Sequence, residues 1–329
     1  MKYIKQNYKF IIILMSIVLF LSIRFPYYID APGGISDMNK KIEIDGYESI
    51  GSFNVAYVKE YRATIPTLII SLFNKHWDVI KEKEVLLDNE SSDDYNKRDK
   101  LFMNESISNA IYVAYTKASK DIKILSNNST IIYIDKLSNT DLKVGDSILE
   151  IEGRKINRKE DITNIIDNYN VDDKLNIKVK NDNKEYNRYA KVIELDGEKK
   201  LGLLLVTLNE YELNPDIVVN IDDNESGSSA GLIAALTIYN NLVKEDITNG
   251  LKIVGTGTID INGNVGAIGG VSYKLKSAEA EGADLFLVPI GENYEEAIKL
   301  KKEKNYKIKI IGVKTFEETL NYLENMEVK

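Results

Sequence analysis

The stretch LKIVGTGTIDINGNVGAIGGVSYK, residues 251–274, decides the fold of this chain. Its first residues, Leu251–Val254, form a short apolar run that predicts a buried strand. Glycines then recur through residues 255–270, which is typical of a connecting loop. A helical pattern follows over Val271–Glu281 and ends at Gly282. A strand, a connection and a helix in this order indicate an α/β domain.

Strands and helices alternate on both sides of that stretch, so the α/β domain extends over residues 199–329. The other predicted strands are Leu203–Thr207, Ile217–Ile221, Leu285–Val288 and Ile308–Val313, and the other predicted helices are Ala230–Val243 and one that begins at Thr315 with a capping box.

Residues 121–198 predict a small β-rich module. Its expected order is strands at 131–134 and 148–151, a helix at 161–169, and a strand pair at 175–179 and 189–195. Within it, LKVGDSILEIEG at residues 142–153 resembles the L-x-x-G-D-x-I-x-x-I-x-G signature of PDZ domains in bacterial proteases. Such modules bind an extended peptide at a sheet edge beside a helix. A module that only packs against its neighbour is the alternative.

The first 120 residues divide into two parts. Residues 1–30 contain Lys2, Lys5 and Lys9, the uncharged run Phe10–Ile23, and then Arg24 and two tyrosines. We expect a cytoplasmic N-terminus and an uncleaved transmembrane helix, with the body outside the membrane; a cleaved signal peptide is the alternative. Residues 31–120 form a mixed region, in which 81–100 predicts a solvated helix or loop and 105–118 a helix.

Composition excludes several classes of function. The chain has 329 residues and a net charge of −8, which argues against a nucleic-acid binder. It has no cysteine and one histidine, His76, so disulfides, thiolate metal sites and histidine-rich metal sites are excluded. No G-x-x-x-x-G-K-[ST] motif is present, and no strand–GxGxxG–helix unit with the expected acidic residue. We therefore expect no metal, nucleotide or other cofactor.

A serine and a lysine at two helix starts are the candidate catalytic residues. Ser229 lies among small residues, Gly227, Ala230 and Gly231, which leave room for a substrate backbone beside free N–H groups. Lys274 opens the helix after the glycine-bearing loop, where burial and the helix dipole lower a lysine pKa and make it a usable base. Taken singly, a serine here caps its helix and a lysine is a surface residue.

Together these segments resemble the proteolytic domain of Lon-type proteases, a Ser-Lys dyad family, over about residues 201–324. The family pattern G-P-S-A-G appears as GSSAG at 227–231, and T-G-x-I…G-x-V-x-x-I-G-G-x-x-x-K appears as residues 256–274. The resemblance implies that Ser229 is the nucleophile, Lys274 the general base and Thr256 the residue that orients the lysine amine. Gly227 and Ala230 would support the site.

Three positions depart from the family pattern. Ser228 replaces a proline, Ser226 an aspartate, and Thr258 an acidic residue of cytosolic Lon.

The order of anchor, PDZ-like module and Lon-type domain is similar to that of the membrane-anchored PDZ–Lon peptidases of Gram-positive bacteria. The resemblance implies an ATP-independent serine endopeptidase acting on extracytoplasmic peptides or membrane-proximal proteins, and a homo-oligomeric ring. The alternative is a non-catalytic peptide-binding protein.

Overall fold

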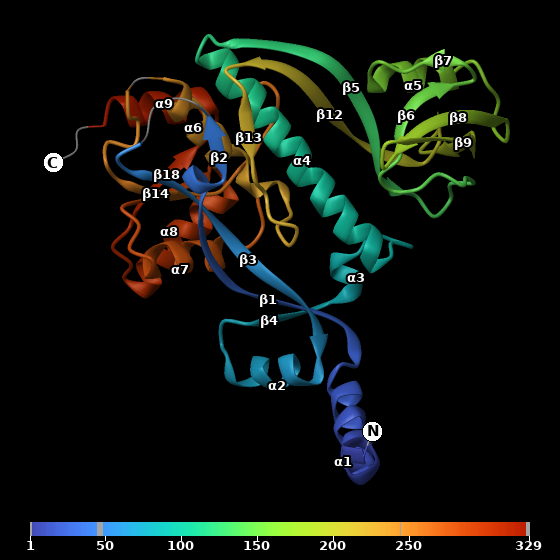
Figure 1. Cartoon of the computed structure of the whole chain (residues 1–329). Coiled ribbons are helices and arrows are strands. Elements are labelled where there is room, and N and C mark those ends of the chain that lie inside the picture. The colour runs from blue at the N-terminus through green and yellow to red at the C-terminus, as the bar shows by residue number, and fades with distance from the viewer. Residues whose placement is uncertain (1, 45–48, 244, 327–329) are drawn as a thin grey trace.

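The computed structural model describes residues 2–44, 49–243 and 245–326. Figure 1 shows a larger α/β unit and a smaller β-rich module, which are joined by a long two-stranded ribbon and flanked by one long helix. Predictions that touch residues 1, 45–48, 244 and 327–329 lie outside the described residues.

The larger unit is built on a six-stranded mixed sheet. In spatial order its strands are β18 (Lys309–Val313), β17 (Leu285–Pro289), β14 (Lys252–Gly255), β3 (Ser52–Thr64), β1 (Arg24–Asp37) and β4 (Asp78–Lys81). The first four run parallel, whereas β1 is antiparallel to β3 and β4 is antiparallel to β1. The N-terminal strands β1 and β3 therefore belong to the same sheet as strands more than 180 residues later in the chain.

Helices cover both faces of this sheet. On one face lie α4 (Ser92–Lys117), α6 (Gly231–Leu242) and α9 (Phe316–Glu324), and on the other lie α7 (Val271–Ala280) and α8 (Glu292–Lys304). Alternation along β17 explains the two cores, because Leu285 and Leu287 face the first and Phe286 and Val288 the second. The predicted α/β class of this unit is confirmed.

The β-rich module has a core of its own and the predicted order of elements. Its strands are β5 (Asp121–Ile134), β6 (Ser147–Ile151), β7 (Arg154–Lys155), β8 (Lys174–Asn181), β9 (Lys184–Lys191) and β12 (Leu203–Asn214), with α5 (Lys159–Ile166) packed on them and the hairpin β10 (Ile193–Leu195)–β11 (Glu198–Lys200) beside α5. β5 and β12 pair along their whole length and form the ribbon of Figure 1.

Short elements complete the described chain. They are η1 (Met38–Lys40), β2 (Ile42–Ile44) paired with β13 (Ile217–Val219), α2 (Ile65–Phe73), α3 (Glu82–Val85), η2 (Ser228–Ala230), and β15 (Thr258–Ile259) paired with β16 (Val265–Gly266).

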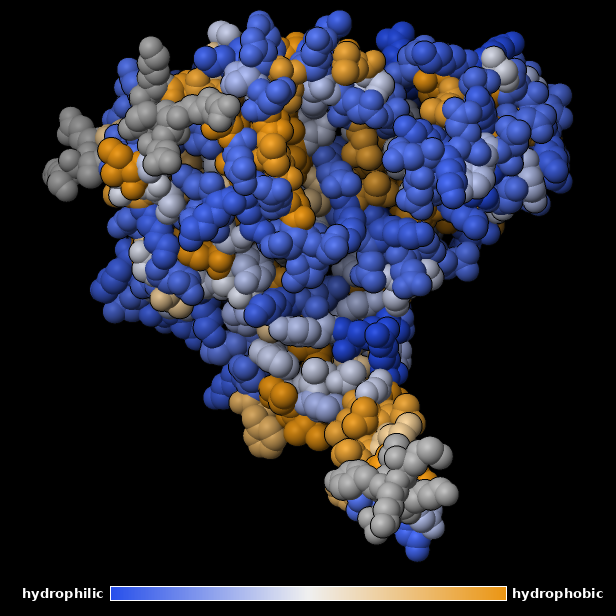
Figure 2. Space-filling model, in the orientation of Figure 1, coloured by the Kyte–Doolittle hydropathy of each residue, from blue (hydrophilic) through white to orange (hydrophobic). Residues whose placement is uncertain are grey.

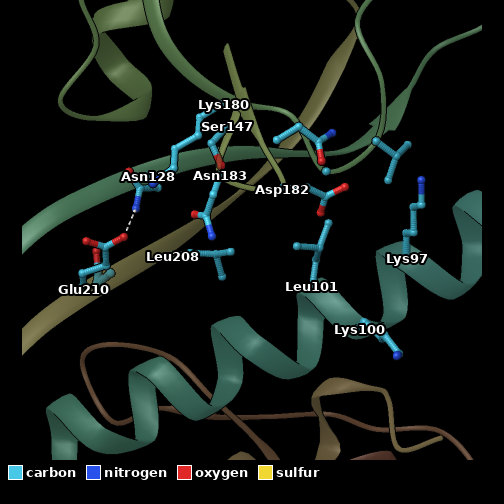
Figure 3. Close-up of a pocket in the computed structure, with 14 residues that line it drawn as sticks. Lys97, Lys100, Leu101, Asn128, Ser147, Lys180, Asp182, Asn183, Leu208 and Glu210 are labelled. Atoms are coloured by element: carbon cyan, nitrogen blue, oxygen red, sulfur yellow. Dashed lines mark hydrogen bonds between the residues drawn. The ribbon is translucent and has the colours of Figure 1, made fainter. Parts of the chain in front are cut away.

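One predicted boundary changes in the first half of the chain. The segment 81–100, expected to be a solvated helix or loop, ends inside α4, which runs unbroken from Ser92 to Lys117. A pocket of about 460 Å³ lies between α4 and the β-rich module (Figure 3). It is lined by Lys97, Lys100 and Leu101 of the helix and by Asp182 and Asn183 of the module, among others. One helix therefore touches both parts of the molecule.

The predicted transmembrane helix is wrong. Among the residues described, no helix has both the length and the apolar character needed to cross a membrane. The N-terminal helix α1 runs from Lys2 to Leu21, and β1 begins at Arg24, so the helix does not extend to the tyrosines at 27 and 28. Its apolar part, Phe10–Leu21, is about 18 Å long at 1.5 Å per residue, whereas a bilayer core is about 30 Å thick.

Candidate active site

Ser229 lies in the short turn η2 that leads directly into α6. Gly227 precedes this turn with a φ of 89°, a conformation that favours glycine. Two bonds from α4 hold the turn: Gly227 N donates to Asp99 O at 3.0 Å, and Ser106 Oγ donates to Ser228 O at 2.7 Å. The backbone around Ser229 is thus fixed by a helix some 120 residues earlier in the chain.

Gly231, the first residue of α6, allows this close approach. A Cβ at this position would lie 2.2 Å from Ser106 Oγ and 2.8 Å from a methyl group of Ile259. Any larger residue would push α6 away from α4 and β15. The small residues around Ser229 therefore serve packing as well as access.

Lys274 lies in the first turn of α7 and is buried, with 4% of its surface exposed. Burial lowers the pKa of its amine from 10.5 to about 8. The helix begins there because Gly270, at φ 70°, turns the chain, and a Cβ on this glycine would approach Val58 of β3 to 2.7 Å. The lysine is therefore held in the sheet-facing core rather than in solvent.

Thr256 links the lysine to the serine turn. Lys274 Nζ donates to Thr256 Oγ1 at 3.1 Å, and Thr256 Oγ1 donates to Ser229 O at 3.3 Å. A further bond from Gly257 N to Ser229 O, 2.9 Å long, ties the loop to the same carbonyl. The loop after β14 thus joins the starts of α6 and α7.

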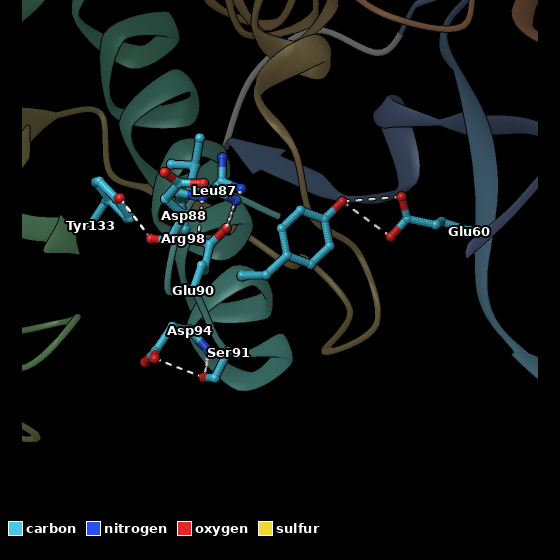
Figure 4. A network of polar contacts seen from close by, with 9 residues as sticks. Glu60, Leu87, Asp88, Glu90, Ser91, Asp94, Arg98 and Tyr133 are labelled. Atoms are coloured by element: carbon cyan, nitrogen blue, oxygen red, sulfur yellow. Dashed lines mark hydrogen bonds and ion pairs between the residues drawn. The ribbon is translucent and has the colours of Figure 1, made fainter. Parts of the chain in front are cut away.

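Ser229 opens into a cleft of about 800 Å³ whose walls come from β1, β3, α4 and the loop at 221–230. On the part of the cleft wall formed by β3 and α4, the Tyr95 hydroxyl donates to both carboxylate oxygens of Glu60 at 3.1 Å (Figure 4). Partial burial, with Asp30 and Asp99 nearby, raises the pKa of Glu60 to about 7. The cleft therefore carries a carboxyl group that titrates near neutral pH.

The structure brings together Ser229, Thr256 and Lys274, with Gly227 and Ala230 in the serine turn. Lys276, two residues beyond Lys274, is not buried in this way. The sequence analysis did not identify Ser106 or the α4 residues that form the cleft wall. These residues match no motif, and the helical pattern at 105–118 indicated only that one face of this helix is buried.

The geometry agrees with a family match in the same region. Residues 219–325 match the model of the Lon protease (S16) C-terminal proteolytic domain. This part of the chain is therefore similar to that proteolytic domain. Lon protease 2 of Bacillus subtilis (strain 168) is 39% identical over 95 residues, which is 29% of this chain but only 16% of that protein.

Two solved structures are similar to part of the chain. The PDZ domain of the SdrC-like protein from Listeria monocytogenes aligns with 22% identity and a TM-score of 0.23, covering 26% of this chain and 93% of that domain. The second domain of another listeria protein aligns with 25% identity and a TM-score of 0.22, covering 26% of this chain and 88% of that one. At these scores the comparisons support no further conclusion.

Proposed function

We propose that this chain is an ATP-independent serine endopeptidase with Ser229 as nucleophile and Lys274 as general base. One observation carries the proposal: a buried lysine amine is joined through Thr256 to the backbone of the serine at the mouth of a cleft. Because burial lowers the pKa of Lys274 to about 8, part of the amine is neutral near neutral pH and can accept a proton.

The chemical steps follow from these positions. When Ser229 Oγ bonds to the carbonyl carbon of a peptide, its proton passes to Lys274 Nζ. The ammonium then returns this proton to the leaving amine as the C–N bond breaks, which leaves an acyl-enzyme. Water attacks the ester next, and Lys274 accepts a proton from the water. Lys274 then returns this proton to Ser229 Oγ as the ester C–O bond breaks, which releases the carboxylic acid and restores the free serine. The first N–H groups of α6 lie beside Ser229 and would stabilise the oxyanion in both halves.

Thr256 would orient the base. A neutral amine has one lone pair, and donation to Thr256 Oγ1 fixes the direction of one of its N–H groups. This leaves the lone pair free to face the serine hydroxyl. The valine substitution Thr256→Val keeps the shape and removes that bond, so it should lower kcat while the substrate KM stays close to the parent value.

The substrates we propose are peptides and loosely folded protein segments. Such substrates need no nucleotide-driven unfolding, which fits a sequence without a G-x-x-x-x-G-K-[ST] motif. The β-rich module, with the element order expected of a PDZ-like domain, would hold an extended peptide strand for the cleft.

The test is peptide cleavage without ATP by the purified parent and four variants. Ser229→Ala and Lys274→Ala should abolish cleavage, and Thr256→Val should slow it. Lys276→Ala is the matched control, because this lysine lies on the same helix outside the buried site and should remain active. Cleavage that persists in folded Ser229→Ala, or a parent that cleaves no peptide of a broad set, would refute the proposal.

A further inference from the structure

The loop at residues 220–226 forms part of the cleft wall and leads into the serine turn. It lies between the end of β13 at Val219 and the start of η2 at Ser228 and contains no helix or strand. Ile221 is its one apolar residue, and Figure 2 shows a mostly hydrophilic surface over the larger unit. Polar contacts therefore have to hold this wall in place. The loop residues that line the cleft are Ile221, Asp222, Asn224, Glu225 and Ser226.

The acidic side chains of this loop oppose a single fixed conformation. Asp222, Asp223 and Glu225 lie close together in the sequence, and the loop has no basic residue of its own. Asp223 lies 3.8 Å from Lys100 of α4, but both side chains are exposed, so this ion pair contributes little. The other charged residues that line the cleft, apart from Lys41, belong to β3 and α4 and are Lys59, Glu60 and Asp99. Repulsion among the loop carboxylates would therefore spread the loop unless a cation lies between them.

Lys41 supplies that cation and holds the loop at both ends. Lys41 Nζ donates to Asp222 Oδ2 at 2.8 Å and to Glu225 Oε2 at 2.7 Å. The Lys41 carbonyl oxygen accepts a bond from Asn220 N at 2.7 Å. The Lys41 side chain is only 14% exposed, so solvent screens these ion pairs less than pairs on the open surface. Lys41 lies between η1 and β2, outside the residues that match the proteolytic domain, so the N-terminal part of the chain completes the cleft.

The serine turn has a separate support. Gly227 and Ser228 are bonded to Asp99 and Ser106 of α4, and neither bond involves Lys41. The loss of the Lys41 charge should therefore loosen the wall at 220–226 and leave the serine turn in place.

We infer that Lys41 is a positioning residue for substrate binding: its two ion pairs fix the loop at 220–226 as the wall against which the substrate chain lies beside Ser229. This inference rests on the proposed peptidase function. When the loop is released, only a fraction of the molecules has the wall in place, and the apparent affinity for substrate falls by that fraction. The chemical step at Ser229 is unchanged once substrate is bound, so KM changes and kcat does not.

The test uses the full chain and fluorescein-labelled casein, an unfolded protein, as the probe. Lys41→Met keeps the length of the side chain and removes its charge. It should raise KM about tenfold and leave kcat within about twofold of the parent, since a hydrogen bond to a charged group contributes about a factor of ten to an equilibrium. A role in overall stability alone would instead lower kcat with KM unchanged, because part of the enzyme would be unfolded.

Three further variants sharpen the comparison. Lys41→Arg should restore KM, because the guanidinium group can donate to both carboxylates. Glu225→Gln should raise KM, and its effect should be smaller when Lys41 is already methionine, because the two residues share one contact. Lys40→Met is the matched control: this adjacent lysine is 81% exposed and does not line the cleft, so KM should equal the parent value.

A second measurement needs no cleavage. Casein binding to the Ser229→Ala protein, followed by fluorescence anisotropy, should weaken about tenfold when Lys41→Met is added. Amide hydrogen exchange without casein should become faster at Glu225, whose N–H donates to Asp222 O at 2.9 Å, and stay slow at Gly227, whose N–H donates to Asp99 O.

The outcomes separate this inference from the proposed function. Unchanged KM, casein affinity and Glu225 exchange in Lys41→Met would overturn the role of Lys41 while the peptidase function stands. A fall in kcat at constant KM would overturn it as well. If the parent cleaves no casein but the difference in casein binding and exchange is present, the role of Lys41 stands and the peptidase function fails.

Discussion

Replacing Lys274 by methionine should stabilise the protein at neutral pH while it removes the proposed activity. Methionine has a similar length and shape and carries no charge, so the packing around α7 is retained. In the folded chain the amine is buried and its pKa falls from 10.5 to about 8. At about 1.4 kcal/mol per pKa unit, the charged amine therefore costs about 3 kcal/mol of stability at pH 7.

The stability cost of burying the charged Lys274 amine depends on pH, because the pKa of this amine is lower in the folded state than in the unfolded state. The folded state binds the Lys274 proton less tightly than the unfolded state, so the cost is present in full below pH 8 and disappears as the pH rises from about 8 to 10.5. Losing the bond to Thr256 subtracts about 1 kcal/mol from the gain at every pH. The expected net gain is about 2 kcal/mol at pH 7 and none at pH 10.

Urea unfolding of the parent and the Lys274→Met variant at pH 7 and pH 10 measures both values. Lys276→Met serves as control, because this partly exposed lysine should show a much smaller difference between the two pH values. If the Lys274→Met variant is less stable than the parent by the same amount at both pH values, the pKa of the Lys274 amine is not lowered in the folded protein. The assignment of Lys274 as the base would then lose its physical ground.

Three further predictions follow from the geometry. Peptide cleavage by the parent should rise about 50-fold in kcat/KM between pH 6 and pH 8 as Lys274 loses its proton, and a flat profile across that range in initial-rate assays would contradict this role. Gly231→Ala should lower the free energy of unfolding by about 1–3 kcal/mol because its Cβ meets Ser106 Oγ, and adding Ser106→Gly should restore part of the loss in urea titrations. Thr315→Ala should cost about 1 kcal/mol, since the Thr315 hydroxyl accepts a bond from Glu318 N at 3.1 Å; an unchanged urea midpoint would exclude this cap.

Local patterns predicted most elements of the second half of the chain, but they missed α8 and placed the strand at 203–207 in the α/β domain, whereas β12 pairs with β5 of the β-rich module. The strand at 252–255, the helix at 271–280 and the capped start of α9 lie where the apolar period and the turn residues placed them. The resemblance to Lon-type proteolytic domains, and not a local pattern, joined Ser229, Thr256 and Lys274 into one site. The structure brings them together because they lie at the ends of elements that pack against one another.

The first half of the chain was harder to predict for a physical reason. β3 pairs with β14, which lies almost 200 residues later in the sequence, and no local pattern indicates such a pairing. The charged residues at 81–100 suggested solvent on all sides, although one face of that helix lines the cleft through Tyr95 and Asp99. The apolar run at 10–23 was extended too far, because hydropathy does not show that the helix ends at Leu21 and a strand begins.

The two bonds from α4 to the serine turn also limit how the chain can change in length. Asp99 and Ser106 are seven residues apart, which is close to two helical turns, so both lie on one side of α4 and hold the adjacent residues Gly227 and Ser228. Inserting or deleting one residue between them would rotate one contact by about 100° relative to the other. A single-codon insertion or deletion in the middle of α4 would therefore release the turn that carries Ser229, whereas a substitution there leaves both bonds in register.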